Sequence, residues 1–324
     1  MRRIATLLLV LTLGPAASYA QTTRLLIVVG LGGDPEHGEL FRKWGTTLSE
    51  TASGKLGIPK GNIIYLSDDP QAAARSTREG IHKAFADLAA EAGEDDTVAI
   101  VLFGLGTFDG KVAKFNLPGP DMTAEEFVPL LAKVKSKRVV FVDTASASGP
   151  FVEALSGPGR VILAATRTGA EKFATLFGGP FVEAFSTEAA DTDRDGRVSF
   201  LEAFEYARKQ VAASYQREGL MQTEHAILDD NGDKEGSMEP GPQAKDGQSA
   251  AVLSLGSMKP QAAPATEQLR GLYAERQALE RRIESLKLLK SGMDPDKYAS
   301  ELEKLVTELA LKSRQIREAE GKGK

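Results

Sequence analysis

A run of acidic and small residues, DTDRDGRVSFLE from Asp191 to Glu202, has the residue types and the spacing of a calcium-binding loop. Ca²⁺ binds six to eight oxygen atoms, and a twelve-residue loop of this kind supplies them from fixed positions. The predicted ligands are Asp191, Asp193, Asp195, the backbone carbonyl of Arg197, Ser199 and Glu202. Gly196 stands at position six, where the backbone turns sharply, and Val198 is the apolar residue that anchors the loop. The sequence therefore predicts Ca²⁺ as a cofactor.

A second acidic stretch, DDNGD from Asp229 to Asp233, has no acidic residue at the twelfth position of such a loop. We therefore interpret it as a turn, which leaves the first loop without a partner loop. A single loop in a calcium-rich compartment needs only modest affinity to stabilise a fold. We expect the calcium site to be structural.

A turn of small residues from Thr144 to Gly149 follows the apolar run Arg138–Val142 and Asp143. The run has no polar alternation, which is typical of a strand buried on both faces of a parallel sheet. In an open α/β sheet, the loops at the carboxyl ends of the strands line the ligand crevice. The hydroxyl groups of Ser146 and Ser148 are therefore expected where a reactive group would lie. Ser146 is not part of a Gly-x-Ser-x-Gly motif, however.

A serine hydroxyl needs an adjacent base to become a nucleophile. The chain has three histidines, His37, His82 and His225, and the first follows a predicted strand, so it belongs to the same rim as Ser146. A Ser146–His37 pair, oriented by Asp143 or Asp109, is one alternative for the chemistry of this rim.

Five short apolar runs alternate with helical patterns, and they are expected to position these residues. The strands are predicted at residues 24–29, 62–66, 97–103, 138–142 and 160–166. Strands that alternate with helices at this spacing predict a doubly wound, mainly parallel α/β sheet.

The N-terminal segment, residues 1–20, has the pattern of a secretory signal peptide. Arg2 and Arg3 precede an apolar run that is too short to span a bilayer, and Ala20 ends a small-residue cleavage site. The chain has no cysteine, which excludes disulfides and thiol catalysis. After cleavage the net charge is near −7, which argues against nucleic acid as a partner. We expect an exported protein, periplasmic or extracellular, without a membrane span.

The composition changes after Asp233. Residues 234–265 are rich in Gly, Pro, Ser and Gln, which predicts a flexible linker. Residues 266–319 are charged, with apolar residues at heptad spacing in two halves that Ser291–Pro295 separates. This pattern predicts an antiparallel helical hairpin, or coiled coil, that is short enough to need a partner or self-association.

The order of these elements resembles the caspase-like fold of the C13 and C14 cysteine peptidases, the clan of caspases, metacaspases and legumains. The resemblance covers about residues 24–233. In that clan a catalytic His follows the third strand in a Gly-His-Gly turn, and a catalytic Cys follows the fourth strand. Here the first turn is Gly104-Leu105-Gly106 and the second is Thr144–Gly149. The resemblance thus implies that Leu105 replaces the His and Ser146 replaces the Cys.

Leucine cannot accept or donate a proton, so the chemistry of the clan is expected to be lost. The sequence then favours an exported, bacterial-type pseudo-peptidase that binds calcium and acts as a protein- or peptide-binding module. Two alternatives stay open: a serine-dependent hydrolase that uses Ser146, and a calcium-stabilised structural protein of the cell envelope.

Overall fold

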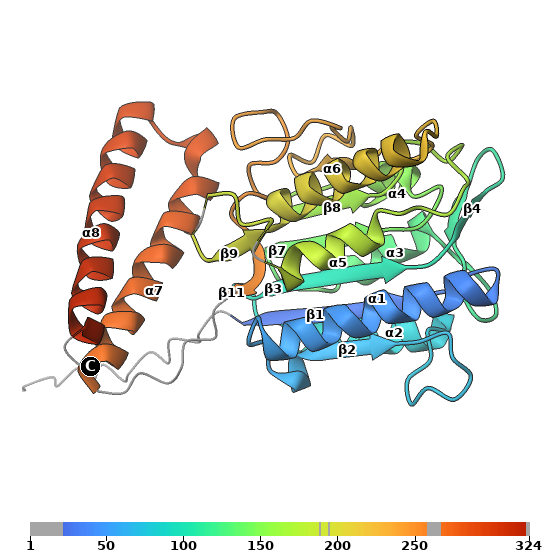
Figure 1. The fold of residues 1–324 in the computed structure, drawn as a ribbon, viewed down its shortest axis with the longest axis horizontal. Helices are drawn as coiled ribbons and strands as arrows, with labels where there is room; N and C mark the ends of the chain where they lie inside the picture. The colour runs from blue at the N-terminus through green and yellow to red at the C-terminus, as the bar shows by residue number, and fades with distance from the viewer. Residues whose placement is uncertain (1–21, 188, 194, 258–266, 322–324) are drawn as a thin grey trace, which may run out of the picture.

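The computed structural model describes residues 22–187, 189–193, 195–257 and 267–321. The predicted signal peptide lies outside the described residues. The chain forms an α/β domain with a mainly parallel central sheet, followed by two long helices (Figure 1).

The central sheet has six strands in the order β10-β8-β7-β3-β1-β2. The strands are β1 (Thr23–Val29), β2 (Ile63–Leu66), β3 (Thr97–Phe103), β7 (Arg138–Asp143), β8 (Arg160–Ala164) and β10 (Ile227–Asp229). The first five are parallel and match the predicted strands within two residues. The edge strand β10 is antiparallel to β8, with Ile227 opposite Ala164. The sequence did not predict it, because three apolar residues before an acidic stretch carry no periodic signal.

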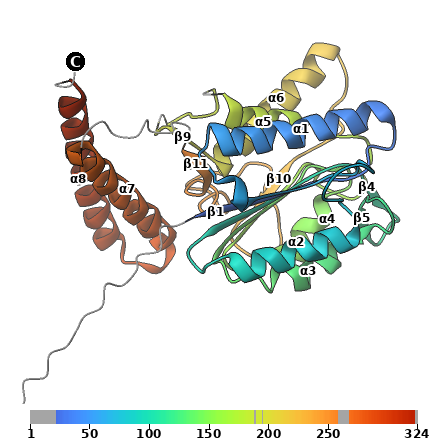
Figure 2. The same ribbon diagram turned by 90° about the horizontal axis from the view of Figure 1, so that it is seen from below.

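Helices cover both faces of this sheet (Figure 2). One face carries α1 (Pro35–Gly54), α5 (Gly178–Ser186) and α6 (Phe200–Glu218). The other carries α2 (Arg78–Glu91), α3 (Ala124–Leu131) and α4 (Gly149–Leu155). Successive residues of β1 serve the two faces in turn, since Ile27 joins the first core and Leu26 the second. Strands buried on both faces explain why these runs are apolar without alternation.

A small antiparallel sheet lies beyond the carboxyl end of β3. It contains β4 (Gly106–Phe108), β5 (Ala113–Phe115) and β6 (Met122–Thr123). The short 3₁₀ turn η1 (Lys60–Asn62) leads into β2.

Residues 234–257 are packed against the domain, although their composition predicts a flexible linker. Ala250, Val252, Leu253 and Leu255 are buried in the same core as α5 and α6. The short strand β11 (Ser254–Ser257) pairs with β9 (Arg197–Ser199). The linker prediction is therefore wrong as far as Ser257, because a few well-placed apolar residues anchor a segment whose Gly and Pro form tight turns. The remainder of that prediction, residues 258–265, lies outside the described residues.

Two helices, α7 (Glu267–Leu288) and α8 (Pro295–Gly321), follow, with the 3₁₀ turn η2 (Lys290–Gly292) between them. Leu279, Ile283 and Leu286 of α7 pack with Leu305 of α8 in a small apolar cluster. Within the described ranges, no helix combines the length and the apolar character that crossing a membrane requires.

Candidate functional site

The acidic loop predicted to bind calcium connects α5 to α6. Its second half is fixed by β9, whose central residue Val198 is 1% exposed and packs in the core. Ser199 caps α6, where its side chain accepts a hydrogen bond from the backbone N–H of Glu202. The strand β11 pairs with β9 in the antiparallel direction, with Ser254 opposite Ser199. Strand pairing and the burial of Val198 therefore hold this end of the loop.

The first half of the loop brings three carboxylates together. One oxygen from each of Asp191, Asp193 and Asp195 lies within 4.8 Å of the other two. The backbone N–H of Asp195 donates to Asp191 Oδ1 at 3.1 Å and to Asp193 Oδ1 at 3.0 Å. The N–H of Gly196 donates to Asp191 Oδ2 at 3.0 Å, and its φ of +86° is one that glycine adopts without strain. These bonds point the carboxylates inward.

The twelfth residue, Glu202, closes the loop from the other end. Its Oε1 accepts hydrogen bonds from the Thr192 backbone at 2.8 Å and the Thr192 hydroxyl at 2.9 Å. Its Oε2 accepts from the backbone N–H and the hydroxyl of Ser199, both at 2.9 Å. The structure thus places Glu202 across the loop from the aspartates, and uses the Ser199 hydroxyl for capping.

The carboxylates of the loop repel one another. Burial and, second to it, the nearby Asp193 carboxylate raise the pKa of Asp195 to about 6. Burial also raises the pKa of Asp193, to which the charges of Glu202 and Asp191 add. Glu202 differs, because hydrogen bonds from Ser199 and Thr192 outweigh its burial and lower its pKa. Three hard oxygen donors at close range, with a fourth carboxylate opposite, fit a calcium ion, whose charge would relieve this repulsion.

The second candidate site lies at the carboxyl ends of β1, β3 and β7. Ser146 is 1% exposed there, and both hydrogen bonds of its hydroxyl involve Gly106. Ser146 Oγ donates to the Gly106 carbonyl at 3.0 Å and accepts from the Gly106 N–H at 3.1 Å. Ala147, the next residue, has a φ of +55°, a strained conformation for a residue with a side chain. The turn therefore contains a strained residue, and the Ser146 hydroxyl is hydrogen-bonded to β4.

The residue in place of the expected base, Leu105, is half-buried beside the same turn. Its N–H donates to the Leu31 carbonyl at 3.0 Å, and its carbonyl accepts from the Asn116 N–H at 3.0 Å. A Cβ atom at Gly33 would lie 2.9 Å from Leu105 Cδ1, so the leucine side chain packs against the loop after β1. Leu105 thus places an apolar side chain, with no group that exchanges protons, at this position.

His37 does not form the alternative pair with Ser146. Its Nδ1 lies 2.7 Å from Asp34 Oδ2, and its backbone N–H donates to Asp34 Oδ1 at 2.9 Å. Asp34 caps α1, so the histidine is part of that helix start. In the described part of the chain, no hydrogen bond joins Ser146 to a histidine.

Asp143, which ends β7, is a buried carboxyl group. Its Oδ1 accepts from the Ala145 N–H at 3.0 Å, while its Oδ2 has no hydrogen-bond partner. Burial raises its pKa to about 7. The other proposed orienting acid, Asp109, is exposed and accepts hydrogen bonds from the N–H groups of Lys111 and Val112. Neither carboxylate is hydrogen-bonded to His37.

The structure adds a pair of residues that the sequence did not place beside the Ser146 turn. Glu171 accepts from the His225 N–H at 3.0 Å, and its Oε1 lies 2.9 Å from His225 Nδ1. The Glu171 carbonyl accepts from the N–H of Ala147, so this pair adjoins the Ser146 turn. Arg167, which could bind an acidic ligand, donates its N–H to Glu171 as well. Residues 171 and 225 are 54 positions apart, and no local pattern could have joined them.

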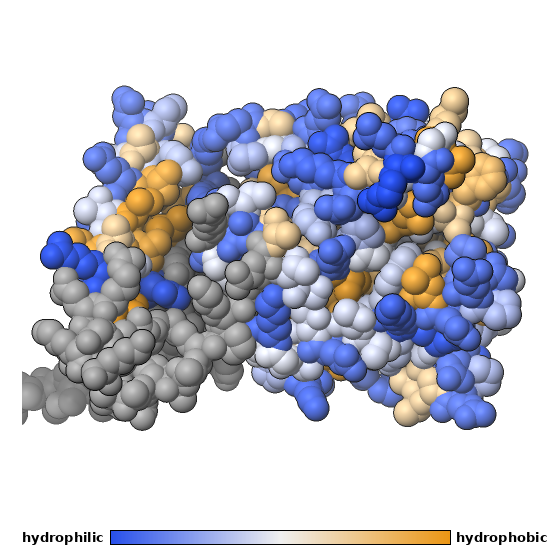
Figure 3. Space-filling model, in the orientation of Figure 1, coloured by the Kyte–Doolittle hydropathy of each residue, from blue (hydrophilic) through white to orange (hydrophobic). Residues whose placement is uncertain are grey.

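Apolar side chains are exposed at the carboxyl end of the sheet. Leu31 follows β1, Phe173 and Leu176 follow β8, and Leu220 and Met221 precede β10. Phe173 is 71% exposed and Met221 is 86% exposed. Figure 3 shows apolar residues among charged ones on this side of the domain, to the right in the view.

The comparisons with known proteins do not assign this chain to a family: no protein-family model matches it, and no curated protein has a significantly similar sequence. The resemblance to the caspase-like clan therefore stays a prediction.

Proposed function

We propose that this chain is an exported calcium-binding protein whose α/β domain binds peptides or proteins without cleaving them. The observation that carries the proposal is the state of Ser146, a buried hydroxyl that is hydrogen-bonded to both backbone groups of Gly106. A nucleophile needs a base within hydrogen-bond reach, and the residue at that position is Leu105. On this proposal, the turn has a serine hydroxyl that no base activates, so the domain binds peptides without cleaving them.

A binding role is supported by the surroundings of the turn. Exposed apolar side chains, Phe173 and Met221 among them, lie at the same end of the sheet as the turn and offer contact area to a peptide. Arg167 on the loop after β8 supplies a positive charge for an acidic group of the ligand. The ligand class we propose is therefore a peptide with apolar side chains.

The first experiment is a peptide-library assay with three proteins: the parent, Ser146→Ala, and the double variant Leu105→His, Ser146→Cys. We expect the parent and Ser146→Ala to cleave nothing and to bind the same peptides. Cleavage by the parent that is lost in Ser146→Ala would overturn the proposal in favour of a serine hydrolase. If none of the three proteins binds a peptide, the result favours the remaining alternative, a calcium-stabilised structural protein of the cell envelope.

The calcium role has its own test. We expect Ca²⁺ to raise the melting temperature of the parent, because the ion binds the folded loop; at a hundred times Kd the stabilisation is about 2.7 kcal/mol. Asp195→Asn should reduce this increase, because it removes one of the three clustered carboxylates of the loop. Asp69→Asn is the matched control, since Asp69 forms a comparable exposed turn with the Gln71 N–H outside the loop. Equal calcium effects in all three proteins would contradict a calcium site in this loop.

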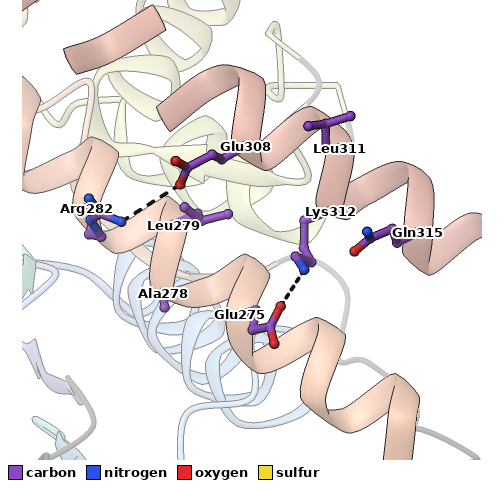
Figure 4. Close-up of a pocket in the computed structure, with 8 residues that line it drawn as sticks. All are labelled: Glu275, Ala278, Leu279, Arg282, Glu308, Leu311, Lys312 and Gln315. Carbon is purple, nitrogen blue, oxygen red and sulfur yellow. Dashed lines mark ion pairs between the residues drawn. The ribbon is translucent and has the colours of Figure 1, made fainter. Parts of the chain in front are cut away.

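We also propose that α7 and α8 form a helical hairpin through which the chain associates with a second copy. A groove on this helix pair is lined by Leu279 and Leu311 and flanked by two ion pairs (Figure 4). These join Arg282 to Glu308 at 4.0 Å and Lys312 to Glu275 at 2.5 Å. Leu311→Glu should convert a dimer to a monomer in light-scattering measurements. A parent protein that is already monomeric would remove this proposal.

A further inference from the structure

The acidic stretch from Asp229 to Asp233, which the sequence predicts to be a turn, reproduces features of the calcium loop at Asp191. Its first, third and fifth residues carry side-chain oxygens: Asp229, Asn231 and Asp233. Asn231 Oδ1 accepts from the Asp233 N–H at 2.8 Å, and Asp233 Oδ1 accepts from the Glu235 N–H at 2.8 Å. The same bonds, three to five and five to seven, occur between Asp193, Asp195 and Arg197 in the first loop.

The sixth position has a positive φ in both loops. Gly196 has a φ of +86° in the first, and Lys234 has a φ of +72° in the second. A lysine rarely adopts this conformation. The second segment therefore has a positive φ at the same position as the first, although its sequence has no glycine there.

Asp229 supplies an independent observation that points to a ligand. The residue is 1% exposed, and its Oδ1 accepts from the N–H groups of Asn231 and Gly232, which turns the carboxylate into the loop. Its Oδ2 is buried and has no hydrogen-bond partner. A polar oxygen that is buried without a partner destabilises the fold, and a bound cation would supply that partner.

A carboxyl group from farther along the chain lies beside this loop. Asp246 is 2% exposed, and its Oδ1 accepts from the Asp230 N–H at 3.3 Å, so its carboxyl group lies against the second residue of the loop. Asp230 itself faces the other way and accepts from the N–H groups of Gly247 and Ala250. These two bonds fix the segment that carries Asp246.

One cation of the protein already lies at the edge of this cluster. Lys245 Nζ pairs with Asp233 Oδ2 and lies 3.4 Å from Glu235 Oε2. Its side chain is 65% exposed, so the ammonium group reaches the cluster from solvent and compensates Asp233 rather than the buried Asp229.

We propose that Asp229, Asn231, Asp233 and Asp246 form a second calcium site. The donors are carboxylate and amide oxygens, which are the ligands that Ca²⁺ prefers, and Lys245 competes with the ion for Asp233. This site does not depend on calcium binding at Asp191. Residues 246–257 connect the two loops, because Asp246 lies at one end of this segment and β11, the partner of β9, at the other.

The test counts calcium ions bound to the full chain by equilibrium dialysis and by titration calorimetry, with circular dichroism to check folding. We expect two ions in the parent and in the control Asp69→Asn, and one ion in Asp229→Asn and in Asp195→Asn. One ion in the parent that is lost in Asp195→Asn and kept in Asp229→Asn would overturn the second site and leave the first intact. The reverse pattern would support the second site and remove the first.

The variant Lys245→Gln tests the second site without removing any of its proposed ligands. Without the competing ammonium group, the second site should bind Ca²⁺ about two- to five-fold more tightly, the range typical of one exposed ion pair. The first site should keep its affinity. If neither affinity changes, Asp233 is not a ligand and the proposed set of donors is overturned.

Discussion

Replacement of Asp143 by asparagine should remove a large part of the pH dependence of stability. The folded protein keeps Asp143 protonated up to a pKa of about 7, because the group is buried, whereas an aspartate in the unfolded chain releases its proton near its ordinary pKa of 3.8. The stability that the proton contributes is therefore complete below the unfolded pKa and is lost as the pH rises through the folded one.

The magnitude follows from the two pKa values. Between pH 8 and pH 5, binding of this proton should raise the free energy of unfolding by about 3 kcal/mol, as an upper bound. For a urea m-value of about 3 kcal/mol/M, this corresponds to a shift of about 1 M in the urea midpoint. Asparagine keeps an oxygen that accepts from the Ala145 N–H, and its side chain does not titrate between pH 5 and pH 8. The Asp143→Asn variant should therefore lose this shift in the urea midpoint.

The assay is urea unfolding at pH 5 and pH 8, with a chelator present so that calcium does not contribute. The measured quantity is the difference in midpoint shift between parent and variant, which cancels the titration of Glu224, a second carboxyl group whose pKa burial raises to about 7. Asp69→Asn, an exposed substitution, should retain the parent's shift. An identical shift in Asp143→Asn and the parent would refute the argument from burial.

Three further substitutions test the packing of the Ser146 turn, of the acidic loop and of the two C-terminal helices. Gly106→Ala places a Cβ atom 2.1 Å from the Ser146 carbonyl oxygen, so we expect a loss of about 1–3 kcal/mol in urea unfolding, and unchanged stability would show that the turn adapts. Val198→Ala should cost about 2 kcal/mol and weaken calcium binding, measured by calorimetry, because the anchor of the loop is removed. Leu305→Ala should increase hydrogen exchange in α7 and α8 and leave the sheet protected; faster exchange throughout the domain would contradict the separate apolar cluster of these helices.

The sequence was sufficient for the five parallel strands of the sheet and for the position of the first acidic loop, since both depend on local patterns. Strands buried on both faces must be continuous apolar runs, and β1, β3 and β7 are such runs. The positions of Asp191, Asp193 and Asp195 follow from a loop whose backbone is determined by its own residues. For the same reason the position of Ser146 after β7 was predictable.

Contacts between distant residues were decided by the tertiary structure alone. The composition of residues 234–257 gave no sign that Leu255 would be buried or that β11 would pair with β9, because burial depends on which surface the segment meets. The hydrogen bonds of Ser146 to Gly106 and of Glu171 to His225 join positions 40 and 54 residues apart. Asp246 likewise reaches the Asp229 loop only after the chain has folded back. The amino-acid sequence by itself thus determined which groups the protein has and the local turns that hold them, while the fold determined which of them meet and which are buried without a partner.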